Sequence, residues 1–316
     1  MRKRERIVPG PCVLHAAILL LLGLGSGCGG GGDGEDGGDA VAADAAHADW
    51  LYVVDAGGGT SRILRVRTDG TGMEAVLDPA PDASRGIVLD ASSGTLIWAS
   101  RDGDVIRRAR IDGDSLVAAQ DVIAAGLDSA YAVALDAGNG HLYWSDYGTG
   151  AIHRARLDGT DAQVVVGGLE APRGLAIDVA GGWLYWTDVG TRKLQRARLD
   201  GSDVQDLLTE THGLGRPYGV TVDAARGLMY IADAGTGHIL RARVDGSDVQ
   251  VLIPESGPHP SFILLAPDED RLYWTDNRAN RIRRARLDGT QIEDVVPEGL
   301  AGPRGLVRVE EERREH

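Results

Sequence analysis

Leu184-Tyr185-Trp186-Thr187-Asp188 and Leu272-Tyr273-Trp274-Thr275-Asp276 are two copies of a motif that recurs six times along the chain. The other copies end at positions 55, 100, 146 and 233, so successive copies lie 42 to 46 residues apart. Asp-Gly pairs keep the same step, at 69–70, 112–113, 158–159, 200–201, 245–246 and 288–289. A short apolar run, such as 174–178, precedes every motif but the first, and a sixth run stands at 304–309. A repeat of this length indicates a repeat architecture such as a propeller.

Each repeat divides into segments that fit short strands. In the best copies these are 174–178, the motif at 183–187, an alternating run such as 152–157, and a last run such as 162–166. The Asp-Gly pair between the last two predicts a hairpin with a type I′ turn, in which both central residues have positive φ. Four antiparallel strands per repeat predict an all-β, six-bladed β-propeller over residues 49–310.

The two ends of the repeat region predict how the ring closes. The first copy begins at Leu51 without a leading strand, and the chain ends with a spare one at 303–309. We expect this last strand to complete the first blade, because a blade is too small to bury both of its faces alone.

The N-terminus is predicted to be an export signal with a lipid anchor. Basic residues precede an apolar run at 13–24 that is too short to span a bilayer, as in a signal peptide. The sequence Leu24-Gly25-Ser26-Gly27-Cys28 resembles the lipobox of bacterial lipoproteins, which implies cleavage after residue 27 and lipidation of Cys28. Gly29, rather than Asp, implies the outer membrane by the same resemblance. The alternative is ordinary cleavage nearby, with Cys28 incidental.

Composition limits the rest of the chain. Residues 28–48, rich in Gly, Asp and Ala, are predicted to be a flexible linker, and 311–316 a charged tail. The net charge of −14 argues against a nucleic-acid partner. Cys12 and Cys28 are the sole cysteines, so the repeat region has no disulfide or thiolate metal site.

The repeated landmarks resemble the class B (Tyr-Trp-Thr-Asp) repeats of the low-density-lipoprotein receptor family. Residues 184–188 and 272–276 match that motif fully, and an Ile-x-Arg-x-x-Leu-Asp-Gly element matches at 152–159 and 282–289. The resemblance implies a six-bladed propeller that binds protein ligands and performs no chemistry. The first and fifth copies also resemble NHL repeats. The cysteine-rich modules of the receptors are absent from this sequence, so the binding partners of the receptors are not expected to be partners of this protein.

The most repeated residues are interpreted as structural. The Tyr, Trp and Asp of the motif recur because blades must pack on one another, and Asp90, Asp136, Asp178 and Asp223 recur in the same way at the ends of the apolar runs. Arginines at equivalent places are expected to stack on a neighbouring Trp or to pair with the motif Asp. These are Arg154, Arg196, Arg241 and Arg284.

Where the repeat varies, a binding site is predicted. The residues just before the apolar runs are expected to form a ring at one mouth of the central channel and to bind a ligand there. They are Arg85, Tyr131, Arg173, Tyr218, Ser261 and Arg304. An arginine fork suits carboxylates, and tyrosine offers rigid contact area. The alternative is that these arginines balance nearby acids.

Sequence signatures of enzymes are missing: there is no Gly-x-Ser-x-Gly and no His-Glu-x-x-His. We therefore expect a monomeric, membrane-tethered bacterial propeller that binds a protein, peptide or glycan, without catalysis, cofactor or metal. Two alternatives remain. One is an extracytoplasmic hydrolase or lyase, similar to the propeller lactonases that bind a divalent cation in the channel; the other is a structural envelope protein.

Overall fold

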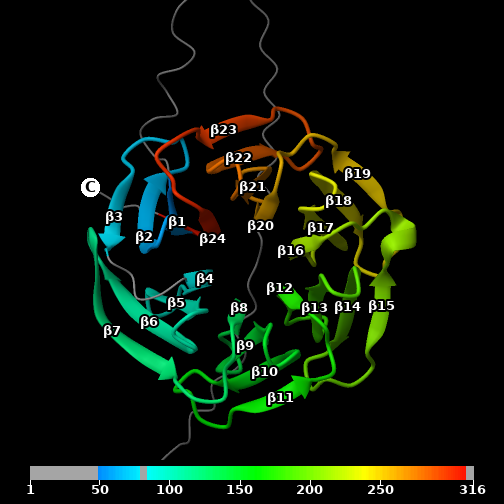
Figure 1. Cartoon of the computed structure of the whole chain (residues 1–316), viewed down its shortest axis with the longest axis horizontal. Helices are drawn as coiled ribbons and strands as arrows, with labels where there is room; N and C mark the ends of the chain where they lie inside the picture. Colours follow the sequence, from blue (N-terminus) through cyan, green and yellow to red (C-terminus); the bar gives the residue numbers. More distant parts are fainter. Residues whose placement is uncertain (1–48, 79–83, 311–316) are drawn as a thin grey trace, which may run out of the picture. The chain divides into compact units, whose positions relative to one another are not determined.

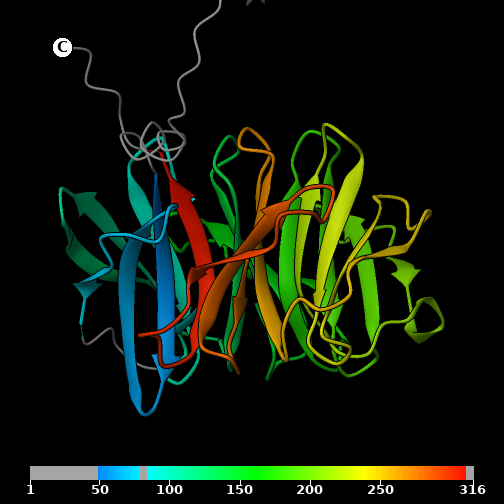
Figure 2. The same cartoon turned by 90° about the horizontal axis from the view of Figure 1, so that it is seen from above.

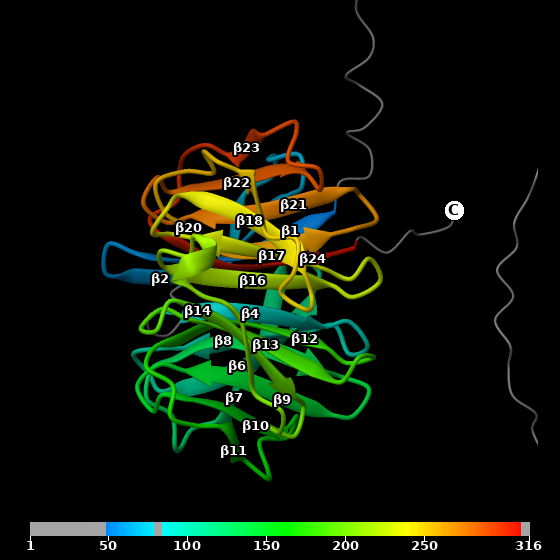
Figure 3. The same ribbon diagram turned by 90° about the vertical axis from the view of Figure 1, so that its right-hand side faces the viewer.

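The predicted all-β ring is confirmed. The computed structural model describes residues 49–78 and 84–310, and in them six four-stranded antiparallel sheets stand around a central axis (Figure 1). Seen edge-on, the strands of each sheet run from one face of the ring to the other (Figures 2 and 3). The predicted signal peptide (1–27), linker (28–48, with Cys28) and tail (311–316) lie outside the described residues. In the described part, no helix has the length and apolarity needed to cross a membrane.

The sheets are numbered here as blades 1 to 6, each from its innermost strand outward. Blade 1 holds β24 (Pro303–Val309), β1 (Trp50–Gly57), β2 (Thr60–Arg67) and β3 (Glu74–Leu77). Blade 2 holds β4 (Ser84–Asp90), β5 (Thr95–Ser100), β6 (Val105–Asp112) and β7 (Ser115–Ile123). Blade 3 holds β8 (Ala130–Asp136), β9 (His141–Asp146), β10 (Ala151–Arg156) and β11 (Gln163–Val166).

Blade 4 holds β12 (Pro172–Asp178), β13 (Trp183–Asp188), β14 (Lys193–Arg198) and β15 (Gln205–Leu208), and the 3-10 helix η1 (Glu210–His212) follows it. Blade 5 holds β16 (Pro217–Asp223), β17 (Leu228–Asp233), β18 (His238–Arg243) and β19 (Gln250–Ile253). Blade 6 holds β20 (Pro260–Ala266), β21 (Arg271–Asp276), β22 (Arg281–Arg286) and β23 (Glu293–Val296).

The last strand closes the ring as predicted. Strand β24 pairs antiparallel with β1, in a register that sets Trp50 opposite Val309 and Val53 opposite Leu306. Arg308 of β24 donates to the carboxylates of Asp49, 2.7 Å away, and of Asp268 in the blade 6 turn. The two ends of the repeat region are thus joined by a ladder of backbone hydrogen bonds and a charged cluster.

The motif strands hold neighbouring blades together. Side chains alternate across a strand, so the fully buried Tyr185 and Trp186 of β13 point to opposite neighbours. Tyr185 packs in a cluster with Met229 of blade 5, and Trp186 in a cluster with Ile152 of blade 3. The aromatic residues of the motif are therefore packing residues, as interpreted from their repetition.

Of the two contacts that the sequence predicts for the equivalent arginines of the third strands, only the stacking on a tryptophan occurs in the part of the chain that the structure describes. Arg196 does lie over the Trp183 ring, 4.1 Å from its centroid, but none of these arginines pairs with a motif Asp in the described residues. Each donates instead to a backbone carbonyl of the next blade, at 2.8 to 3.5 Å. The six links run from Arg65 to Gly113, Arg108 to Leu157, Arg154 to Leu199, Arg196 to Val244, Arg241 to Leu287 and Arg284 to Thr68.

The motif Asp accepts backbone hydrogen bonds from the loops around it, and in blade 1 Asp55 also accepts from Arg62 of β2, at 2.9 and 3.0 Å. Asp233 accepts from the amides of Gly215, Arg216 and Gly235 at 2.6 to 2.8 Å, and so joins the loop that enters its blade to the turn that follows the motif. A buried carboxylate held in this way satisfies amides that the loop would otherwise leave unpaired.

The type I′ prediction for the Asp-Gly turns is wrong in all six blades, because in each turn the glycine has positive φ but the aspartate does not. Gly159 has φ of 86°, whereas Asp158 is not among the residues with positive φ. The Asp158 carboxylate accepts from the amide and hydroxyl of Thr160, at 2.9 and 2.6 Å, and this bonding favours an ordinary right-handed turn that ends in a left-handed glycine.

The glycine of this turn also touches the preceding blade. A Cβ added at Gly159 would overlap the Val122 carbonyl oxygen of β7, and Gly201, Gly246 and Gly289 approach the preceding blade in the same way. Gly113 is the equivalent residue of blade 2, has φ of 57° and would meet nothing within 4 Å.

We predict that Gly159→Ala destabilises the protein at least twice as much as Gly113→Ala. Both variants carry the cost of a left-handed alanine, about 1 to 2 kcal/mol, whereas the first adds a clash between blades. Thermal and denaturant unfolding of the two variants measures the difference. Equal losses would contradict the inter-blade role of the turn glycine.

Candidate ligand-binding mouth of the channel

The six predicted ring residues occupy the same place in the six innermost strands. Each is the second residue of its strand, and in every blade the pairing register shifts by one residue at this point. In blade 4, for example, Pro172 lies opposite Asp188 but Leu175 opposite Trp186, so Arg173 and Gly174 share a single partner position. Such a β-bulge turns side chains out of the regular pleat.

The hydroxyl of the motif holds this bulge. The Thr187 Oγ1 accepts from the amide of Gly174, at 2.9 Å, and donates to the carbonyl of Tyr218 in the next blade, at 2.7 Å. Ser145 makes the matching pair of bonds in blade 3, to Ala132 and to Arg173. In blades 3, 4 and 6, where the motif carries Ser or Thr, this hydroxyl thus fixes the backbone next to the ring residue; blades 1, 2 and 5 carry Val or Ala there.

Three ring residues of blades 3, 4 and 5 form one cation–aromatic cluster. The Arg173 guanidinium lies 4.8 Å from the centroid of the Tyr131 ring and 4.3 Å from that of Tyr218. It also donates to the Tyr131 hydroxyl at 3.2 Å, and Tyr147 lies 5.2 Å away on a third side. Arg173 is therefore held in place while remaining partly exposed.

The other three ring residues lie beside this cluster at different depths. Arg85 is only 8% exposed, and burial, together with the charge of Arg304 on the neighbouring strand, lowers its pKa to about 10. Arg304 is half-buried, and its Nε has no hydrogen-bond partner among the described residues. Ser261 is buried, with its hydroxyl likewise unpartnered there. The ring therefore contains both buried and partly exposed side chains.

Several residues of the mouth were missed by the sequence analysis. Phe262, the one phenylalanine of the chain, stands where other blades carry Gly or Ala, and its ring stacks on Tyr131 of the opposite blade with centroids 5.6 Å apart. Arg216 donates to the Tyr218 hydroxyl, and the His259 ring meets Tyr218 edge to face. Burial, and the nearby Arg216 and Arg304, lower the pKa of His259.

The identity of Phe262 offered a signal that could have been read from the sequence, since a unique residue breaks a six-fold pattern. Arg216 and His259 gave no comparable signal, because each lies in a loop just before its inner strand, where the repeat is not kept.

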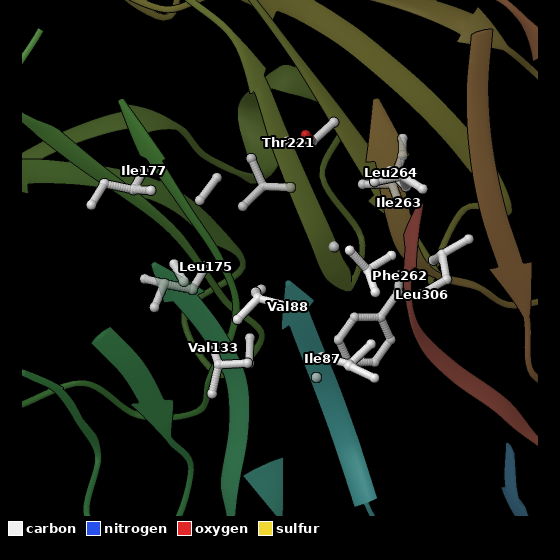
Figure 4. Close-up of a pocket in the computed structure, with 18 of the residues that line it drawn as sticks. Ile87, Val88, Val133, Leu175, Ile177, Thr221, Phe262, Ile263, Leu264 and Leu306 are labelled. Carbon is white, nitrogen blue, oxygen red and sulfur yellow. The ribbon is translucent and has the colours of Figure 1, made fainter. Parts of the chain in front are cut away.

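Beneath the mouth the channel is a cavity of about 350 Å³ bounded by all six innermost strands (Figure 4). Its lining side chains are aliphatic apart from Phe262 and Thr221. Metal-dependent propeller lactonases need oxygen or nitrogen ligands here, and a single hydroxyl does not fit a divalent cation. In the part of the chain that the structure describes, no three His, Cys, Asp or Glu side chains gather as a metal site requires.

The charge of the mouth is not balanced locally. None of Arg85, Arg173, Arg216 and Arg304 makes an ion pair with a described acidic residue, although many arginines elsewhere on the protein do. Asp90, Asp136, Asp178 and Asp223 bond to their own turns, as expected of structural residues. The arrangement offers guanidinium donors beside flat aromatic faces, which suits a carboxylate or another anion.

Known structures share this architecture. A chain of the crystal structure of a nidogen/laminin complex superposes with a TM-score of 0.72 at 25% identity, covering 81% of this chain and 97% of that one. The putative TolB from Agrobacterium tumefaciens, at 17% identity, superposes with a TM-score of 0.61 over 82% of this chain and 92% of its own, a likeness of fold alone. No curated protein sequence matches the chain.

The sequence comparison identifies a family. The profile of the SMP-30/Gluconolactonase/LRE-like region matches residues 45–278, which include most of the blades and five of the six ring residues. The chain belongs to this SMP-30/Gluconolactonase/LRE-like family of β-propellers.

Proposed function

We propose that this propeller is a non-enzymatic binding protein that holds a carboxylate-bearing ligand at the Arg–Tyr mouth of its channel. The observation that carries the proposal is the group of four arginines without an acidic partner among the described residues, in a chain whose net charge is −14. The buried Nε atoms of Arg173 and Arg304 lack acceptors there. A ligand that supplied carboxylate oxygens would satisfy these donors, which are costly to leave unpaired.

The ligand class follows from the same geometry. Tyr131, Tyr147 and Tyr218 give the mouth rigid aromatic contact area of the kind that anchors protein ligands. The similar propeller named above comes from a complex with laminin, which supports a polypeptide partner. We favour an acidic segment of a protein or peptide; an acidic glycan shares the carboxylate chemistry.

Replacing Arg85, Arg173 and Arg304 together by Ala is expected to weaken binding of an oligo-aspartate peptide at least tenfold, equivalent to about 1.4 kcal/mol. Titration calorimetry of wild type and variant measures the loss. The matched control replaces Arg192, Arg243 and Arg286, which are exposed, and so removes the same charge elsewhere on the surface.

Unchanged affinity in the mouth variant, with its near-ultraviolet circular dichroism intact, would overturn the site. Affinity capture from envelope extracts, with and without protease treatment, then separates a polypeptide ligand from a glycan.

Family membership favours a second candidate, a lactonase-type hydrolase. The aliphatic channel opposes it, because the lining side chains supply neither a metal site nor a general base. We predict that the purified protein carries no stoichiometric divalent cation and opens no lactone ring when calcium, zinc or manganese is added. One bound cation per chain, or lactone hydrolysis abolished by a chelator, would favour the hydrolase.

We further propose that Cys28 carries the lipid that tethers the propeller to the bacterial envelope, with residues 29–48 as the spacer. This proposal rests on the apolar run at 13–24 followed by Gly25-Ser26-Gly27-Cys28. Labelled palmitate is expected to enter the wild-type protein in cells and to be absent from Cys28→Ala. Labelling that persists in the variant would refute the anchor, whatever the outcome at the mouth.

A further inference from the structure

In two blades a pair of arginines from the third strand lies over a tryptophan ring of the second strand. In blade 1 the Trp50 ring lies beneath Arg65 and Arg67, whose guanidinium carbons are 4.1 and 4.4 Å from its centroid. In blade 4 the Trp183 ring lies beneath Arg196 and Arg198, at 4.1 and 3.8 Å. Both indoles start the motif strand of their blade, at β1 and β13.

Blade 3 keeps the arginine pair but not the tryptophan. The strand register that sets Trp183 opposite Arg198 sets His141 opposite Arg156, and Arg154 matches Arg196. Imidazole is much smaller than indole, and a cavity of about 420 Å³ opens here, lined by His141, Arg154, Arg156, Asp161, Ala162 and Gln163.

Blade 3 also has a glutamine in the place of the one that holds an arginine in blade 4. In blade 4, Arg196 donates to the Gln205 side chain at 2.8 and 3.0 Å, and Gln163 lies opposite Arg154 in the same register. Arg156 is already held by Asp161, at 2.7 Å. Arg154 makes no ion pair with a described residue, and its contact with the Leu199 carbonyl is long, at 3.4 Å. Arg154 and Arg156 are thus present in blade 3, and the cavity beside them and His141 stands where the other two blades have an indole ring.

We propose that this cavity in blade 3 is a binding site for a planar aromatic side chain, that of a tryptophan in a partner polypeptide. The chain itself places an indole at this position in two other blades, and tryptophan is the aromatic residue with the strongest attraction for a guanidinium group. The site lies on the outer strands β9 to β11, apart from the innermost strands that form the mouth, so it does not depend on the function proposed for the mouth.

The test uses the mature chain and N-acetyltryptophanamide as the probe. Nuclear magnetic resonance is expected to show saturable shifts of the His141 ring and of the Arg154 and Arg156 Nε–H signals, and no such shifts with N-acetylleucinamide. His141→Trp, which fills the cavity from within, is expected to abolish these shifts. Val179→Trp adds a tryptophan at an exposed turn of blade 4 and is expected to leave them unchanged.

Arg156→Ala gives a second route if the filled variant does not fold, because Arg156 is exposed and its loss spares the core. It is expected to weaken binding of the probe at least threefold. Absence of a saturable shift in the wild type, or shifts that persist in His141→Trp, would overturn the proposal.

Discussion

The pairing of β1 with β24 is the interaction on which the rest of the structure depends. Each blade buries its two faces against its neighbours, so an open array would expose an apolar face at either end. The β1–β24 ladder, which pairs Trp50 with Val309 and Val53 with Leu306, joins the first blade to the last strand of the chain, so neither end of the array leaves an apolar face exposed. The arginine links between blades then run around a complete circle, the last from Arg284 to the Thr68 carbonyl of blade 1.

The closed ring also explains how a structural motif creates a variable surface. The Thr187 hydroxyl holds the bulge of its own blade and the backbone of the next, and Arg173 and Tyr218 project from that backbone. Their side chains are free to differ because the main chain does the positioning. The three arginines of the ring can therefore gather at one mouth with Arg216 of the adjoining loop, where their mutual repulsion is tolerated by a rigid scaffold and would be relieved by an anionic ligand.

Membership of the SMP-30/Gluconolactonase/LRE-like family and the chemistry of this channel point in different directions. The family name suggests hydrolysis of lactones, yet the cavity is lined by side chains such as Val88, Leu175 and Ile177, which neither bind metal nor move protons (Figure 4). Fold and function are separable in this way because activity depends on a few side chains grafted on a scaffold. Our proposal of recognition rather than catalysis rests on this lining and on the arginines of the mouth.

The sequence predicted the architecture well, because three landmarks in six copies constrain a ring strongly and the spare strand at 303–309 is visible in the repeat itself. It also located the six ring positions, since these are defined by register. It did not predict the depth of Arg85 or the stack of Phe262 on Tyr131, which depend on how opposite blades face across the channel. The turn at Asp158 was misjudged because the carboxylate bonds locally to Thr160 and keeps its own residue right-handed.

The central claim is that the arginines of the mouth are free to receive an anion, whereas linking arginines such as Arg65, Arg196 and Arg284 are held by the scaffold. The most direct test follows the Nε–H signals of individual arginines while an oligo-aspartate peptide is titrated into the purified protein. The account predicts saturable shifts at Arg173 and Arg304 and none at the linking residues Arg65, Arg196 and Arg284. Shifts spread evenly over all arginines, or none at the mouth, would contradict it.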